Sequence, residues 1–343
     1  MTCTFSDHLS HDARDTGVPA RLYAMDTAKG IGIAFVVFGH AWRGAYDAGL
    51  LTDSDLFRWV DAVIYAWHMP LFFFLSGIFF LELLKRRAPF AFFKDRGLRL
   101  LWPMAIWTWI FFGAKLLAGS AANHPVGLAD FPLIPLPPYE HLWFLWTVFL
   151  VQGAVLALYL ALRGRLDQKR LRLLAGIGAM GLALLMPLIY LPSTVFGPAV
   201  AHFPFFLAGI AMGGHGNARP SGLMAAAAAV IFAVLLAQVA LSGGASISSL
   251  ALTVLLYSVC LWLDPNRRVP GPTLRLLRTL GRYSMAIFLA HTIFSAAVRI
   301  GLIQVGHTAL VPQLLLASLA GLLGPILLVL LARRLRLQRL LGL

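Results

Sequence analysis

Charged residues are scarce in this 343-residue chain, making up 12% of it, whereas 59% of the residues are hydrophobic. Soluble domains hold about 25% charged residues. The apolar residues also form repeated uninterrupted runs, and crossing a bilayer takes about 20 mostly apolar residues. The composition therefore excludes an ordinary soluble globule and indicates a membrane protein.

Several motifs of well-known enzymes are absent from the sequence. It contains no P-loop ending in GK[ST], no HExxH helix and no GxSxG elbow. Its two cysteines, Cys3 and Cys260, are too few for a disulfide framework or a cysteine-based metal site. Nothing here supports an ATPase, a zinc protease or a serine hydrolase, and we expect no metal.

Acidic residues are also few, which leaves a net charge of +14. A nucleic-acid partner does not follow, because the basic residues lie in short segments between apolar runs. With the N-terminus in the cytoplasm, 24 of the 28 Lys and Arg residues fall on the cytoplasmic side. This bias predicts an even number of spans in the lipid bilayer, with both termini inside.

The apolar runs predict an all-α, polytopic membrane protein with about ten transmembrane helices. Residues 1–24 predict a polar, disordered N-terminal tail without a signal peptide, and residues 25–343 predict one integral membrane domain. The sixth run is short and flanked by Gly and Pro. The predicted spans are 26–44, 60–83, 100–119, 141–162, 172–191, 198–214, 221–241, 246–263, 282–303 and 309–332.

Ionisable residues inside a membrane span are candidates for function, because lipid disfavours them. The first span, MDTAKGIGIAFVVFGHAWRG, places Lys29 and His40 eleven residues apart. This spacing is close to three helical turns, so both side chains face the same way, about 16 Å apart along the axis. Lys29 could instead be a snorkelling anchor, and His40 could satisfy a hydrogen bond between helices.

His68, in HMPLFFFLSG, lies eight residues into the second predicted span. This puts it about 12 Å below the outer surface, at a depth similar to that of His40. We expect His68 to orient His40 or to stabilise an oxyanion, although it could instead satisfy backbone groups freed by Pro70. His202 and His291 are further membrane histidines that a structural role would also explain.

Basic residues mark the cytoplasmic edge. In FFKDRGLRLLWP, Arg96 and Arg99 are spaced i, i+3, so they project from one face of a helix. Two guanidinium groups held in this way suit phosphates, although a cytoplasmic loop would hold arginines in any case. Arg282 is a further basic residue on this side.

Aromatic residues mark the outer edge. The segment YEHLWFLWTVFL opens with Glu140 and His141, followed by Trp143. Aromatic belts are ordinary at membrane interfaces, but such residues also stack on sugar rings. We therefore take these three as candidates for binding an acceptor.

The sequence resembles the acyltransferase-3 family of integral membrane acyltransferases, and in particular its fucose 4-O-acetylase-like branch. The resemblance implies a ten-helix acyltransferase domain with His40 as the essential histidine and Lys29 as its basic partner. It also implies that Arg96 and Arg99 meet acyl-CoA on the cytoplasmic side. The motifs on which the resemblance rests occur in the family's order over roughly residues 24–300. They are DTAKGIGIAFVVFGH, HMPLFFFLSG, FFKDRGLRLLWP, HLWFLWTVFLVQG, FPFFLAGI and GRYSMAIFLAHT.

Together with these features, the resemblance implies transfer of an acetyl group from cytoplasmic acetyl-CoA to a hydroxyl of a sugar in a cell-surface polysaccharide, lipopolysaccharide or glycolipid, at the inner (plasma) membrane. Arg96, Arg99 and Arg282 would hold the donor, and the carbohydrate acceptor could be lipid-linked. His40 would act as general base or would itself accept the acetyl group. The alternative is a proton-coupled transporter or flippase for a lipid-linked sugar, since buried histidines suit a carrier too.

Overall fold

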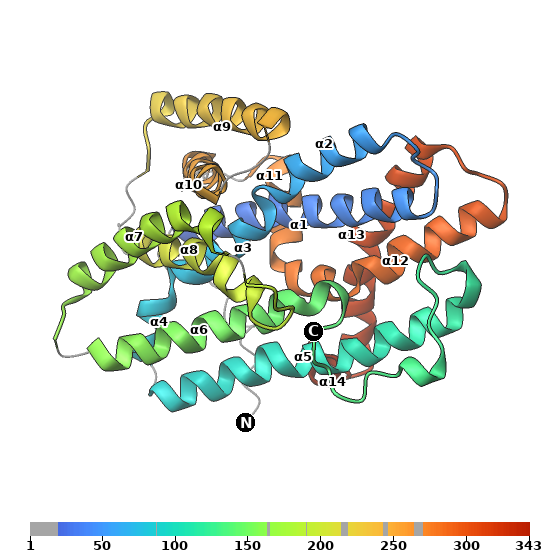
Figure 1. Ribbon diagram of the computed structural model, residues 1–343, viewed down its shortest axis with the longest axis horizontal. Coiled ribbons are helices and arrows are strands. Elements are labelled where there is room, and N and C mark those ends of the chain that lie inside the picture. Colours follow the sequence, from blue (N-terminus) through green and yellow to red (C-terminus); the bar gives the residue numbers. More distant parts are fainter. Residues whose placement is uncertain are drawn as a thin grey trace.

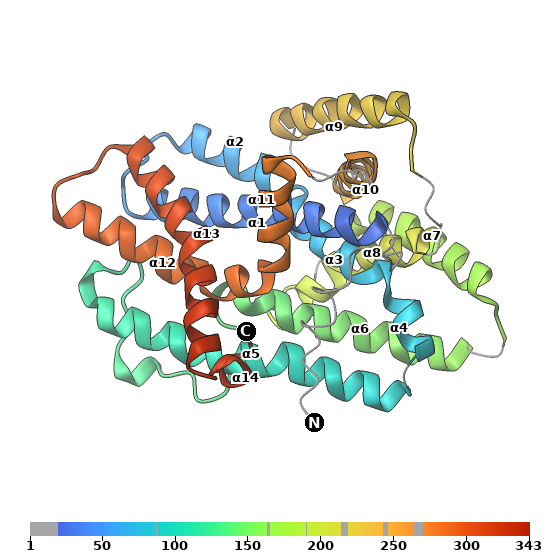
Figure 2. The same cartoon turned by 180° about the vertical axis from the view of Figure 1, so that it is seen from behind.

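The structure, a computed structural model, describes residues 20–86, 88–162, 165–189, 191–213, 219–242, 246–263 and 270–343. The described chain is a bundle of helices joined mostly by short loops (Figures 1 and 2). The predicted N-terminal tail lies outside the described residues up to position 19, and the first helix begins at Ala20. The helices are α1 (Ala20–Asp47), α2 (Ser54–Tyr65), α3 (His68–Ile78), α4 (Phe80–Arg86), α5 (Pro89–Ala118), α6 (Trp143–Leu162), α7 (Gln168–Leu185), α8 (Gly197–Met212), α9 (Gly222–Ser242), α10 (Ser246–Leu263), α11 (Pro272–Arg282), α12 (Ser284–Gln304), α13 (Leu310–Arg334) and α14 (Gln338–Leu341).

Each predicted span has a helical counterpart, so the prediction of an all-α polytopic membrane protein is confirmed. Within the described residues, eight helical stretches are long and apolar enough to cross a membrane. The two other predicted spans are α8, which has only 16 residues, and α1, which contains Asp26, Lys29 and Arg43. The eight stretches are Ser54–Arg86, Pro89–Ala121, Glu140–Leu162, Gln168–Leu188, Gly222–Leu241, Ser246–Leu263, Ser284–Gln304 and Leu310–Arg334.

The second span is broken, which its apolar pattern did not predict. The expected single helix over 60–83 is divided among α2, α3 and α4. Pro70 lies in the first turn of α3, where a helix does not need the missing N–H. Helix α2 ends at Tyr65 and helix α3 begins at His68, so the two helices need not share one axis.

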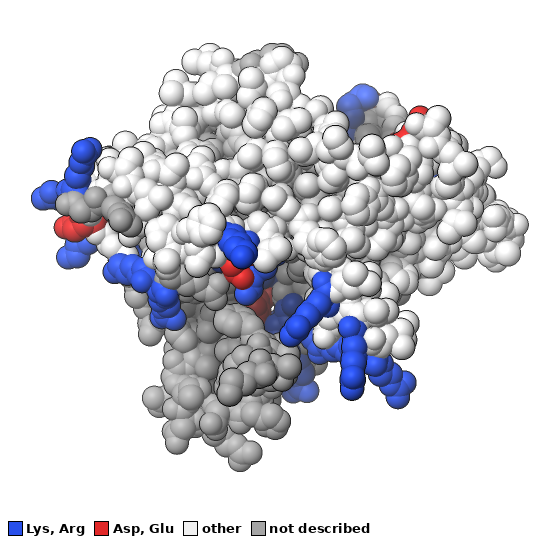
Figure 3. Space-filling view, turned by 90° about the horizontal axis from the view of Figure 1, so that it is seen from below, with Lys and Arg blue, Asp and Glu red and all other residues white. Residues whose placement is uncertain are grey.

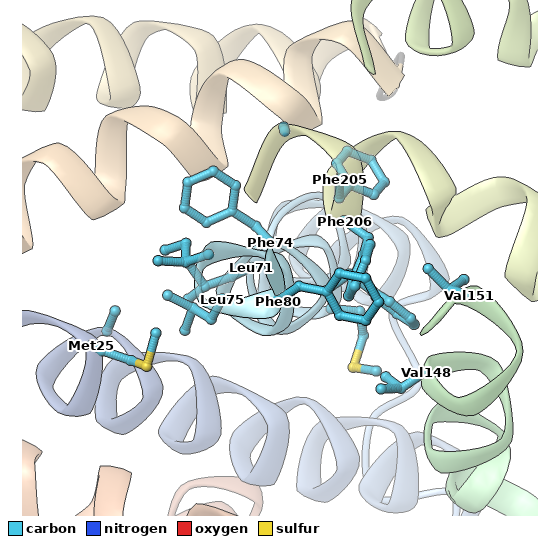
Figure 4. Close-up of a cluster of buried hydrophobic side chains, with 14 of the residues drawn as sticks. Met25, Leu71, Phe74, Leu75, Phe80, Val148, Val151, Phe205 and Phe206 are labelled. Atoms are coloured by element: carbon cyan, nitrogen blue, oxygen red, sulfur yellow. The ribbon is translucent and has the colours of Figure 1, made fainter. Parts of the chain in front are cut away.

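Helix α3 lies at the centre of the apolar core (Figure 4). Leu71, Phe73 and Phe74 are completely buried, and Phe206 of α8 is buried with them. In lipid, such helices associate through close packing, which small residues at the contact allow. A methyl group added at Gly209 of α8 would lie 2.0 Å from the Phe74 carbonyl oxygen, so the two backbones are in direct contact there.

Helix α1 meets α11 in the same way. A methyl group at Gly30 would lie 1.9 Å from the Leu277 carbonyl oxygen, and one at Gly281 would lie 1.9 Å from that of Asp26. Glycine is required at both positions because any side chain would overlap the opposite backbone. The contact fixes the first turns of α1, including Lys29, against α11.

The loop that joins α5 to α6 is attached at both ends. Near its start, the amide of Asn123 donates to the carbonyl oxygen of Gly44 on α1 (3.0 Å) and accepts from Arg299 Nη2 on α12 (3.1 Å). At its end, Glu140 forms an ion pair with Lys115 of α5. The loop is therefore held against α1, α5 and α12.

Charge is unevenly distributed over the surface. The ends of α4 and α6 and the starts of α5 and α7 meet at the left of Figure 1, where the basic segments of α4, α5 and α7 lie. Seen from below, Lys and Arg side chains cover the left and the lower middle of the molecule, while its right-hand extremity is almost uncharged (Figure 3). This asymmetry agrees with the charge bias of the sequence.

Candidate active site

Three histidines from distant parts of the chain meet in the helical bundle. They are His40 of α1, His291 of α12, and His141 of the 3-10 turn Glu140–Leu142 that leads into α6. The ring centroid of His40 lies 5.6 Å from that of His141 and 5.0 Å from that of His291. The rings of His141 and His291 are 5.0 Å apart. We call this group the histidine cluster.

Backbone carbonyl groups fix two of these rings. His141 Nε2 lies 3.0 Å from the Phe288 carbonyl oxygen, and His291 Nδ1 lies 2.9 Å from the carbonyl oxygens of Ile287 and Phe288. A carbonyl oxygen only accepts, so both ring nitrogens must carry a proton and donate. In the neutral rings, His141 Nδ1 and His291 Nε2 then keep a lone pair. The latter atom is buried and has no hydrogen-bond partner in the described part of the chain.

His40 differs from its two neighbours in accessibility. His141 is 6% exposed and His291 is fully buried, whereas the side chain of His40 keeps part of its surface accessible. Among the described residues, no hydrogen bond anchors the His40 ring. His40 is therefore the member of the cluster that a substrate can reach and that can reorient.

A cavity of about 320 Å³ lies beside the cluster, between α1, α3, α5, α6 and α12. Most of its wall is apolar, with Lys29 and Arg96 as its charged groups. Phe288 belongs to this wall, and its ring lies 5.2 Å from the ring of His141. The cavity thus holds two cationic side chains and is separated from the histidine cluster by Phe288, and we call it the donor cavity after the role that we propose for it.

The two arginines of the predicted pair lie in different surroundings. Arg96 lines the cavity, and its guanidinium carbon lies 5.1 Å from the centroid of the Phe92 ring. Arg99 is exposed and forms an ion pair with Asp95 (3.0 Å). It is not among the residues that line the cavity. Arg282 is also exposed, beside Thr279 on α11.

His68 lies in different surroundings from those expected. Its Nδ1 donates to the Ile64 carbonyl oxygen (2.7 Å), and its ring centroid is 4.5 Å from that of Tyr65. The rings packed against His40 are those of His141 and His291. A role of His68 in catalysis stays a prediction that the geometry does not favour.

The three predicted acceptor residues are not gathered at one place. His141 is buried in the histidine cluster instead of lying at the outer surface. Glu140, one residue earlier, pairs with Lys115 and is exposed. Trp143 packs 5.2 Å from the ring of His202 and stacks on Phe73. The sequence alone did not indicate that His141 would lie beside His40 and His291.

The described residues hold no group of three or more His, Cys, Asp or Glu residues arranged to bind a metal ion.

Comparison with known proteins decides the family. The family model described as "Acyltransferase domain" matches residues 22–330, which is most of the chain. The chain belongs to the acyltransferase-3 family. The chain is a multi-pass membrane protein, and this match favours an enzyme over the transporter or flippase alternative.

Two curated relatives match part of the chain. Both are named nodulation protein NolL, one from Sinorhizobium fredii (strain NBRC 101917 / NGR234) with 33% identity and one from Mesorhizobium japonicum (strain LMG 29417 / CECT 9101 / MAFF 303099) with 29%, each over 136 residues. These matches cover 38% and 39% of this chain and 35% of each relative, so the chain spans about a third of the length of these relatives. No solved structure matches the chain significantly.

Proposed function

We propose that this acyltransferase moves an acetyl group from cytoplasmic acetyl-CoA to a hydroxyl of a sugar in a cell-surface polysaccharide, lipopolysaccharide or glycolipid, at the inner (plasma) membrane. The observation that carries the proposal is the donor cavity, which holds Lys29 and Arg96 and reaches Phe288, whose ring packs against His141 of the histidine cluster. An anionic head group at the cationic end and a thioester at the histidine end match this arrangement.

Lys29 and Arg96 would hold the phosphates of the donor. A guanidinium group binds phosphate through paired hydrogen bonds, and an ammonium group adds a point charge. The mostly apolar wall between them and the histidines suits the slender arm that carries the thioester. Arg99 and Arg282 lie at the exposed edge, where they would add long-range attraction for a polyanion.

His40 would do the chemistry. In direct transfer, a ring nitrogen of His40 takes the proton of the sugar hydroxyl while the oxygen forms a bond to the thioester carbonyl carbon. The carbon–sulfur bond then breaks, and His40 returns the proton to the departing thiolate. The alternative is attack by a His40 nitrogen on the thioester carbonyl carbon, which breaks the carbon–sulfur bond, gives an acetyl-imidazole and passes the imidazole proton to the thiolate. The sugar oxygen then attacks the acetyl carbon, the carbon–nitrogen bond breaks, and the hydroxyl proton returns to His40.

The two anchored rings would position His40. His291 Nε2 offers an unused lone pair beside the His40 ring. A hydrogen bond from one His40 nitrogen to this atom would leave the other nitrogen free to take the proton. The fixed tautomer of His291, set by the carbonyl oxygens of α12, thereby selects the tautomer of His40.

Acetyl-CoA binding and turnover by the detergent-purified protein test the proposal, with Arg96→Ala and Arg99→Ala as a matched pair. We expect Arg96→Ala to weaken acetyl-CoA binding by about 10- to 100-fold, because it removes charge-assisted hydrogen bonds. Arg99→Ala should have much less effect, because this side chain is exposed and already paired with Asp95.

Loss of O-acetyl groups from the cell-surface glycans of cells that lack the gene, measured by NMR, tests the acceptor class. A folded wild-type protein that neither binds nor consumes acetyl-CoA would refute the donor. Unchanged glycan acetylation in such cells would refute the acceptor.

A further inference from the structure

Gln152 of α6 is a buried polar residue that has no structural explanation in the protein alone. It is 5% exposed, and its Oε1 atom has no hydrogen-bond partner in the described part of the chain. Buried polar side chains in native proteins are nearly always hydrogen-bonded. The unpaired amide oxygen of Gln152 therefore indicates a hydrogen-bond donor that the described part of the chain does not supply.

Gln152 lies in the wall of the donor cavity. The other polar groups of this wall have different properties. Ser76 donates its hydroxyl proton to the Phe72 carbonyl oxygen (2.9 Å), and Lys29 and Arg96 are cations suited to phosphates. Among the lining residues, Gln152 is the one that carries a side-chain amide.

We propose that Gln152 hydrogen-bonds an amide of the pantetheine arm of the acyl donor, and so selects donors that carry this arm. This inference rests on the proposed function, in which an acyl-CoA is the donor. The arm holds two amide groups between the thioester and the phosphates, and both would lose their water on entering an apolar cavity. A side-chain amide both donates and accepts, so it can pair with either polar atom of such an amide.

The position of Gln152 explains what the contact would achieve. The cavity wall passes from Arg96 to Phe288, which touches the histidine cluster, and Gln152 belongs to the same wall. A hydrogen bond to the arm would fix how far the thioester reaches towards His40. Donors without an amide would leave the glutamine unpaired, which is an effective way to reject them.

The test compares Gln152→Met, which keeps the size and removes the amide, with Arg96→Ala and the control Ser258→Ala, whose hydroxyl donates to the Val254 carbonyl oxygen away from the cavity. Binding of three probes is measured by displacement of radiolabelled acetyl-CoA: acetyl-CoA itself, S-acetyl-pantetheine, which has the arm alone, and adenosine 3′,5′-bisphosphate, which lacks it. We expect Gln152→Met to weaken the first two about tenfold and leave the third unchanged, as for the loss of one hydrogen bond. Arg96→Ala should weaken binding of acetyl-CoA and of the bisphosphate, and Ser258→Ala should weaken binding of none of the three probes.

A thermal melt in detergent without donor gives an independent readout. Gln152→Met should melt at the same temperature as the wild type or higher, because the variant removes an unpaired buried amide. A structural glutamine would instead give a lower melting temperature. Equal affinity of Gln152→Met and wild type for S-acetyl-pantetheine, or equal weakening of all three probes, would overturn the inference.

The two proposals fail in distinguishable ways. If the wild type binds no acyl thioester, the proposed donor is wrong. If the wild type and Gln152→Met bind and turn over acetyl-CoA equally well, the donor stands and only the role of Gln152 is lost.

Discussion

The helical bundle contains two groups of histidines, which differ in their surroundings. The histidine cluster contains His40, His141 and His291, whereas His68 and His202 lie separately among aromatic rings of α2, α3 and α6. In both groups, rings donate to carbonyl oxygens of the backbone, as His202 does to Pro198 (2.8 Å). This anchoring hydrogen bond therefore does not distinguish a catalytic histidine from a structural one. The feature on which the proposed catalytic role of His40 rests is instead the packing of two anchored rings, His141 and His291, against one accessible ring.

The largest effect is expected from His40→Ala. Removing the proton acceptor or nucleophile should lower kcat for acetyl transfer by at least about 10²-fold, and by as much as about 10⁴-fold. Binding of acetyl-CoA should persist, because Lys29 and Arg96 are untouched. The measurement is single-turnover kinetics beside an equilibrium binding assay. A His40→Ala enzyme with wild-type turnover would remove the distinction between the two groups.

The next effect is expected from His291→Asn. The asparagine amide can keep the donation to Ile287 and Phe288 that His291 Nδ1 makes, but it has no atom at the position of Nε2. We expect kcat to fall by about 10²-fold with little change in KM for the donor, because only the positioning of His40 is lost.

A double variant sharpens this prediction. Residues that act as one unit are strongly non-additive, so His40→Ala combined with His291→Asn should be about as slow as His40→Ala alone. Multiplying effects would instead show that His291 acts independently of His40.

The smallest catalytic effect is expected from His68→Ala and His202→Ala. These changes should leave kcat close to that of the wild type and lower the thermal stability, by about 1–3 kcal/mol for each lost buried hydrogen bond. Melting curves and steady-state kinetics on the same preparations separate the two outcomes. A large fall in kcat for His68→Ala without loss of stability would restore the role first predicted for it.

Much of the fold could be predicted because span length and polarity are local properties. The ten runs correspond to helices, and even the weakness of the sixth run is reflected in the 16 residues of α8. The break before His68 could not be seen in hydropathy, although Pro70 was a sign of it, and helix α11 was not among the predicted spans.

The site could be predicted only in part. Lys29, His40 and Arg96 stand out in the sequence, but their neighbours depend on how each helix is rotated about its axis. Depth along the axis paired His40 with His68, whereas packing turned His40 towards His141 and His291. That rotation is set by contacts such as Gly30 against Leu277, which no count of residues along the chain reveals.

The attachment of the α5–α6 loop has a consequence for diversity within the family. Asn123 fixes its start to the helices that carry His40 and His291, and His141 fixes its end within the site itself. The residues between these two anchors can therefore change in length and sequence without displacing the imidazoles. A graft of this interval from one acyltransferase into another would exchange the outer surface of the enzyme while retaining its chemical centre.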